Sequence, residues 1–140
     1  MSEDNKALVR RLVEEVWNAG NLAALEEMIA PDYVHHSAPP EVSRGPQGYR
    51  QRVVMDRRPF RDFHLNLEDL ISEGDRVVGR WTIQGIHYGE YLGIAPTGRK
   101  ITFTGIFIVR VAGGKLAEEW EEVDAIGLRQ QLTATTTSEQ

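Results

Sequence analysis

The 140-residue sequence contains no cysteine, which excludes disulfide bonds, thiolate metal sites and cysteine nucleophiles. It also lacks any apolar run long enough to span a membrane. The first residues, Met-Ser-Glu-Asp-Asn-Lys, are polar and do not resemble a signal peptide. We therefore expect a cytoplasmic protein without a membrane partner.

Positive charge is scarce, since 16 lysines and arginines face 21 acidic residues and give a net charge of -5. Nucleic-acid-binding domains normally present a basic face, so nucleic acid is not an expected partner. Five arginines cluster within and just after one predicted helix. A solvated helical face would explain them, and an anion or partner site is the alternative. They are Arg50, Arg52, Arg57, Arg58 and Arg61.

Cofactor and metal motifs are absent as well. The glycine-rich segment 88–99 lacks the spacing of a phosphate-binding loop, and no helix is expected after it. The four histidines lie in three separate segments without a ligand motif. We expect neither a metal nor a cofactor. The histidines are His35, His36, His64 and His87.

The length and an ordinary apolar content of 41% indicate a single domain over residues 1–132. The tail 133–140 is poor in apolar residues and is predicted to be disordered. Apolar residues at helical spacing predict helices over 4–18 and 22–30. A third helix is expected from Gly45 until Pro59 breaks it.

From residue 62 onward the pattern changes to strands, over 63–71, 76–87, 100–111 and the stretch from Lys115, which ends as a short helix. Helices followed by strands indicate an α+β fold, in which a curved antiparallel sheet is covered by the three N-terminal helices. Such a cone would enclose a cavity for a small apolar ligand. Both faces of 100–111 are rather apolar, which favours a homodimer across the sheet.

The strand from Lys115 is unusually rich in acids. At period two, one face carries Leu116, Glu118, Trp120, Glu122 and Asp124, and the other carries Ala117, Glu119, Glu121 and Val123. If the first face is solvated, its acids are surface residues and Trp120 packs locally. If it lines the cavity, Trp120 is a wall and Asp124 is a carboxyl in poorly solvated surroundings. Desolvation raises a carboxyl pKa, as general acid/base catalysis near neutral pH requires.

Several other side chains are candidates for the cavity. His87 shares a strand face with Trp81, although a histidine at a strand end is often only structural. His35 and His36 are adjacent in an extended segment, so at most one of them would face a pocket, and a surface loop is the alternative for both. Tyr49 would be either a core residue or a hydroxyl donor to the cavity.

The chain resembles the SnoaL-like polyketide cyclases, or ester cyclases, of the nuclear transport factor two-like superfamily. The residues that carry the resemblance are G-I-H-Y-G-E-Y-L-G-I-A-P-T-G-R-K from Gly85 and W-E-E-V-D-A-I-G-L-R-Q-Q-L from Trp120, with W-N-A-G-N, D-Y-V-H-H-S and R-G-P-Q-G-Y upstream. It departs from the common pattern at Ile86, where threonine is frequent, and at Thr133, where glycine is frequent.

This resemblance implies a cystatin-like α+β barrel with a deep apolar cavity, usually a homodimer, and cofactor-free intramolecular aldol closure. The family's W-x-x-x-D segment provides a general acid/base, which Trp120 and Asp124 match. Its polar partner would be His87 or His35.

We therefore predict an acid/base enzyme acting on a small apolar carbonyl compound, with Asp124, His87 and His35 as catalytic candidates. A non-catalytic, ligand-binding dimer is the alternative. A further alternative is an epoxide or ester hydrolase, in which Asp124 would pair with a second carboxylate or with Arg80 or Arg110. The expected substrate-binding residues are Trp17, Tyr33, Tyr49, Trp81, Phe107 and Trp120.

Overall fold

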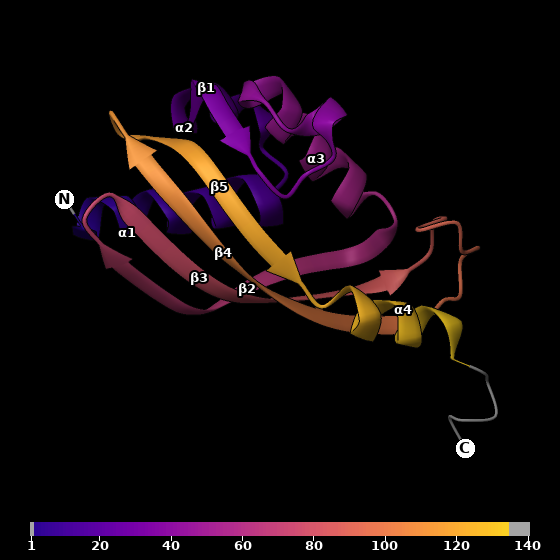
Figure 1. The fold of residues 1–140 in the computed structure, drawn as a ribbon. Helices are drawn as coiled ribbons and strands as arrows, with labels where there is room; N and C mark the ends of the chain where they lie inside the picture. Colours follow the sequence, from indigo (N-terminus) through magenta and orange to yellow (C-terminus); the bar gives the residue numbers. More distant parts are fainter. Residues whose placement is uncertain (1, 135–140) are drawn as a thin grey trace.

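The computed structural model describes residues 2–134. In this part of the chain, helices cover a five-stranded sheet (Figure 1). The helices are α1 (Ser2–Leu12), α2 (Leu25–Met28), α3 (Gly45–Arg57) and α4 (Ala125–Thr133), with short helical turns at Val13–Asn18, Leu22–Ala24 and Pro40–Val42. The strands are β1 (Ile29–His35), β2 (Phe60–Glu73), β3 (Arg76–His87), β4 (Lys100–Ala112) and β5 (Lys115–Val123).

The helices largely follow the sequence pattern. The first predicted helix is observed as α1 followed by a π-helical turn up to Asn18. It ends near Gly20, whose φ of 74° is the left-handed conformation that glycine adopts most readily. The second predicted helix is shorter than expected, because Ile29 leaves the helix with extended backbone angles and begins β1.

The sheet is mixed, and the expectation of a purely antiparallel sheet is wrong. Its order is β1-β5-β4-β3-β2, in which β1 runs parallel to β5 and the other pairs are antiparallel. The surface loop given as the alternative for His35 and His36 is wrong for His35, which is the last residue of β1. An edge strand tolerates proline, as at Pro31, because only one side of it joins the ladder.

Two strand glycines make room for aromatic rings on the concave face. Gly79 of β3 pairs with Phe107 of β4, and Gly105 of β4 pairs with Trp81 of β3. A Cβ atom at either glycine would collide with the opposite ring. Both rings therefore lie against the sheet, which leaves space above them.

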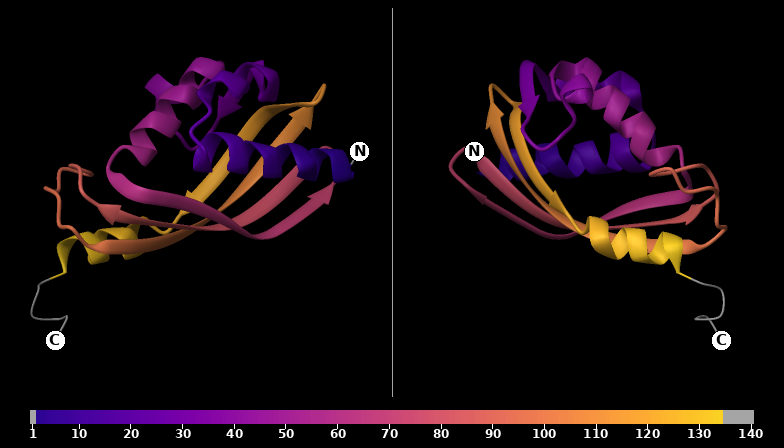
Figure 2. Two further views of the ribbon diagram at one scale, coloured as in Figure 1. Left: turned by 180° about the vertical axis from the view of Figure 1, so that it is seen from behind. Right: turned by 45° about the vertical axis from the view of Figure 1, so that its right-hand side comes forward.

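The sheet curves around one side of the molecule, and α1 and α3 lie over its concave side (Figure 2). The alternation predicted for β3 is confirmed, since Val77, Trp81, Ile83 and His87 are buried together. No helix of residues 2–134 is long and apolar enough to cross a membrane. Of the predicted disordered tail, Thr133 belongs to α4, and residues 135–140 lie outside the described part.

Candidate functional site

A cavity of about 700 Å³ lies between the concave face of the sheet and the helices. This volume is in the range of small-molecule binding sites. Most of its wall is apolar, with polar groups at a few points. Residues from every layer contribute, among them Trp17, Tyr49, Leu65, Trp81, Phe103 and Phe107.

A β-bulge decides which residues of β5 face this cavity. Val111 pairs with Leu116 and Arg110 pairs with Glu118, so β5 has one extra residue, Ala117, between the two pairs. Leu116 therefore points to the same side as Glu119, although the two are three positions apart. The cavity wall on β5 consists of Leu116, Glu119, Glu121 and Val123.

Glu121 is held at the cavity surface by two neighbours. Its Oε2 accepts a hydrogen bond from Trp81 Nε1 at 2.9 Å, and its Oε1 lies 3.4 Å from His35 Nε2. Burial raises the pKa of Glu121 to about 7, against the opposing effects of the Trp81 hydrogen bond and the Arg52 charge. The carboxyl can therefore both accept and return a proton near neutral pH.

His35 is a neutral donor in this arrangement. Its Nδ1 accepts the backbone N–H of Ser37 at 3.1 Å, which places the ring proton on Nε2, toward Glu121. Burial lowers the pKa of His35, which keeps the ring uncharged.

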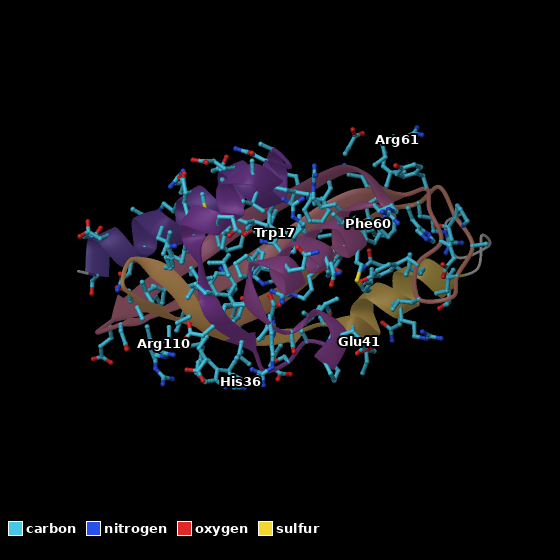
Figure 3. All side chains as sticks on the ribbon, turned by 90° about the horizontal axis from the view of Figure 1, so that it is seen from above. Trp17, His36, Glu41, Phe60, Arg61 and Arg110 are labelled. Carbon is cyan, nitrogen blue, oxygen red and sulfur yellow. The ribbon has the colours of Figure 1, made fainter. Side chains whose placement is uncertain are left out.

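His36 points the other way, as the sequence predicted for adjacent residues of an extended segment. Its Nε2 lies 2.7 Å from Glu118 Oε2, and its ring stacks on Trp120 with centroids 5.0 Å apart. Figure 3 shows His36 and Arg110 at the edge of the molecule, with Trp17 in its middle.

A buried network stands behind Glu121. The Tyr33 hydroxyl donates to Glu119 Oε1 at 2.6 Å and accepts from Arg52 Nη2 at 2.7 Å. Arg52 Nη1 also donates to the carbonyl oxygen of Val42 at 3.1 Å. Burial raises the pKa of Glu119, and the charge of Glu121 adds to this effect. The solvated helical face proposed for the arginines is therefore wrong for Arg52, which is buried.

Tyr49 lines the cavity, and its hydroxyl proton has no acceptor among the described residues. Its oxygen accepts a hydrogen bond from Trp17 Nε1 at 2.8 Å, so its own O–H is directed elsewhere. Burial raises the pKa of Tyr49, which keeps the phenol protonated. Trp17, Tyr49, Trp81 and Phe107 thus lie where the sequence placed them, in the cavity wall, whereas Tyr33 lies behind it.

Two residues expected in the cavity lie outside it. Asp124 is exposed and caps α4, since its Oδ1 accepts the N–H of Gly127 at 2.9 Å. Trp120 is on the outer face of the sheet, where the Arg76 guanidinium lies 5.0 Å from its ring. The solvated alternative for this strand face is the one observed, and the expected cavity position of Asp124 and Trp120 is wrong.

His87 is fully buried but is not part of the cavity wall. Its Nδ1 accepts the N–H of Thr97 at 3.2 Å and lies 3.0 Å from the Thr97 hydroxyl. Its backbone also bonds to Arg99 and Gly98. His87 therefore holds the two ends of the 88–99 loop together.

The sequence did not single out Glu119, Glu121 or Asp56, which line the cavity. The available signal was a pair of acids two positions apart on one strand face, and choosing that face required knowledge of the sheet's curvature. His35, Glu119 and Glu121 also bring potential metal-ligand atoms within 4.8 Å of one another. The proton on His35 Nε2 and the engagement of Glu119 by Tyr33 fit a hydrogen-bonded cluster better than a metal site.

Comparison with known proteins agrees with this architecture. Residues 7–132 match the model of the SnoaL-like polyketide cyclase family. Aklanonic acid methyl ester cyclase DnrD of Streptomyces peucetius is 30% identical over 129 residues, which are 89% of this chain and 88% of that protein. The corresponding cyclase AcmA of Streptomyces galilaeus is 31% identical over 129 residues, 90% of this chain and 88% of its own length.

Among solved structures, TsrD from Streptomyces laurentii superposes with a TM-score of 0.81 at 35% identity, covering 92% of this chain and 97% of TsrD. The α+β cone expected from the sequence is thus shared with these proteins, and the family resemblance is confirmed. The chain belongs to the SnoaL-like polyketide cyclase family.

Proposed function

We propose that the cavity closes a ring in a polyketide-derived ester by an intramolecular aldol reaction, with Glu121 as the base. The observation that carries this proposal is a carboxyl with a pKa of about 7 that opens into an apolar cavity and is oriented by Trp81 and His35. No step of the reaction requires a group from outside the chain.

In this mechanism Glu121 removes a proton from the carbon next to a carbonyl group. Tyr49, whose hydroxyl oxygen is fixed by Trp17, donates its hydrogen bond to the enolate oxygen as charge develops there. The rings of Trp17, Trp81 and Phe107 provide flat apolar surfaces that would hold a fused-ring substrate.

The polar groups of the cavity favour a substrate without a free carboxylate. Asp56, Glu119 and Glu121 are acidic, and the buried cation, Arg52, is already engaged by Tyr33, whereas Arg58 lies on the exposed part of the wall. DnrD and AcmA are named for a methyl ester. We propose an aromatic polyketide methyl ester of the same class as the substrate of this chain.

Two neighbouring glutamates on opposite faces of β5 provide the test. We expect Glu121→Gln to lower kcat on aklanonic acid methyl ester at least about 100-fold, the usual contribution of an acid/base group. Glu122→Gln removes the same charge from the exposed outer face and should leave kcat nearly unchanged. An equal loss of kcat in both variants, or wild-type turnover by Glu121→Gln, would refute the assignment of Glu121 as the base.

We also propose that the outer face of the sheet forms a homodimer. Ile106 of β4 is 47% exposed there, on a strand whose two faces are both partly apolar. Light scattering that gives the mass of a monomer would overturn this. The hydrolase alternative built on Asp124 has no support, because Asp124 caps α4 outside the cavity. Its two candidate arginines also lie away from the cavity, where Arg80 pairs with Asp69 and Arg110 with Glu118.

A further inference from the structure

A second carboxyl group, that of Asp56, faces the same cavity from the helical wall. Residues 49, 52 and 56 of α3 follow the three- and four-residue spacing of a single helix face. Tyr49, Arg52 and Asp56 accordingly all reach the cavity. Unlike the side chains of the first two, the carboxylate of the half-buried Asp56 makes no hydrogen bond or ion pair with any described residue.

The groups that surround Asp56 come from three elements. Glu121 approaches from β5, Arg52 from the same helix, and Tyr91 from the 88–99 loop. Glu90 and Arg58 lie farther out on the cavity wall and are exposed. A substrate held in the cavity would therefore lie between the carboxyl of Asp56 on the helical side and that of Glu121 on the sheet side.

Burial raises the pKa of Asp56 to about 6, the charge of Glu121 adds to this effect, and the Arg52 guanidinium opposes it. The same carboxyl acts on its neighbour: burial raises the pKa of Tyr91 to about 12, and the charge of Asp56 contributes. With this pKa, about a tenth of Asp56 carries a proton at pH 7, compared with about a thousandth of an aspartate in water.

We propose that Asp56 is the catalytic acid that protonates the newly formed alkoxide, while Glu121 is the base that generates the enolate. This assignment rests on the proposed function and adds a second catalytic group to it. Ring closure needs a carboxyl beside the substrate that can deliver a proton, because an alkoxide is far too basic to form without a proton donor. The reactive form has Asp56 protonated and Glu121 ionised, and it is the minor of the two singly protonated forms because the pKa of Glu121 is the higher one.

The step balances without another reactant. Glu121 takes the proton of the C–H bond, and the electron pair of that bond passes into the enolate. The enolate carbon then bonds to the second carbonyl carbon, whose oxygen receives the proton of Asp56. The reaction leaves Glu121 protonated and Asp56 ionised, and exchange of one proton through solvent restores both groups.

The test separates the two halves of the reaction on aklanonic acid methyl ester. Deuterium uptake from heavy water at the attacking carbon reports enolate formation, and product formation reports ring closure. We expect Asp56→Asn to slow closure about 100-fold while exchange falls much less, because the amide cannot supply an acidic proton. We expect Glu121→Gln to lower both rates at least about 100-fold, and Glu122→Gln to change neither.

These outcomes distinguish the two assignments. Exchange and closure at wild-type rates in Glu121→Gln would refute the proposed base. Wild-type closure by Asp56→Asn, with Glu121→Gln inactive, would refute the acid alone. An equal fall of exchange and closure in Asp56→Asn would also refute the proposed acid. The aspartate would then act through the structure or the electrostatic potential of the site and not as a proton donor.

A measurement without substrate provides a further check. Infrared difference spectra of the wild type against Asp56→Asn, taken at about pH 5, should show the loss of one protonated carboxyl band. An unchanged band would mean that Asp56 is ionised there and cannot be the acid. Thermal melts that match the wild type show that the variant is folded.

Discussion

The two faces of β5 place the same residue type in opposite environments. On the outer face, hydrogen bonds from Arg110 and His36 lower the pKa of Glu118. On the inner face, burial raises the pKa of Glu121 to about 7. The comparison shows that solvation and partners, more than the residue type, decide whether a strand glutamate is a surface charge or a proton carrier.

Burying charged groups on the inner face of the sheet lowers the stability of the fold, whereas the charged groups of the outer face stay in contact with water. Glu119 and Arg52 are removed from water. The cost of their desolvation is offset by their attraction to each other and by their hydrogen bonds with Tyr33. Glu118 and Arg110 remain in contact with solvent, where an ion pair contributes little. Changes on the two faces should therefore differ sharply in size.

The largest difference is expected between two arginines. Arg52→Met removes the cation that lies 4.0 Å from Glu119 and the hydrogen bond that Arg52 donates to Tyr33, so we expect the free energy of unfolding to fall by about 3–5 kcal/mol. Arg110→Met removes only a solvated pair and should have a much smaller effect. Urea denaturation followed by circular dichroism measures both. Equal losses would show that the Arg52 network is not a stabilising unit.

A smaller difference should appear in the pH dependence of stability. The pKa of Glu121 is raised from 4.5 to about 7 in the folded state, so the folded protein binds a proton that the unfolded chain has lost between these values. Its contribution is complete below about pH 4 and is lost as the pH rises through about 7, a change of about 3 kcal/mol.

Glu121→Gln does not titrate at this position, so its stability should fall by less than that of the wild type between about pH 4 and about pH 8. Glu122→Gln, changed on the exposed face, should follow the wild-type curve. If all three proteins gave parallel curves, the raised pKa of Glu121 would be wrong.

The same contrast explains how far the sequence could be interpreted. Periodicity and turn residues indicated the helices, the long strands and the buried face of β3, because these depend on local spacing. The parallel strand β1 could not be predicted, since its pairing with β5 joins segments far apart in the chain. The cavity was expected, and Trp17, Tyr49, Trp81 and Phe107 do line it.

The acid residues were assigned to the wrong face for a similar reason. The alternation along β5 separated Glu119 and Glu121 from Trp120 and Asp124, but did not say which set faces inward. The bulge at Ala117, which brings Leu116 to the inner side, depends on the register with β4. Burial of Arg52 likewise depends on Glu119, a residue that follows it by more than sixty positions.

The smallest expected effect concerns Asp124, which caps α4 and lies outside the cavity. Asp124→Ala should lower the free energy of unfolding by about 1 kcal/mol, because the N–H of Gly127 loses its acceptor. Asp124→Ser keeps a capping oxygen without the carboxylate and should recover most of this stability. Neither variant should change kcat on aklanonic acid methyl ester by more than about twofold, since an exposed cap does not contact the substrate. A large loss of kcat in Asp124→Ser, with wild-type stability, would show that Asp124 is the catalytic carboxylate. The inner face of β5 would then not be the catalytic one.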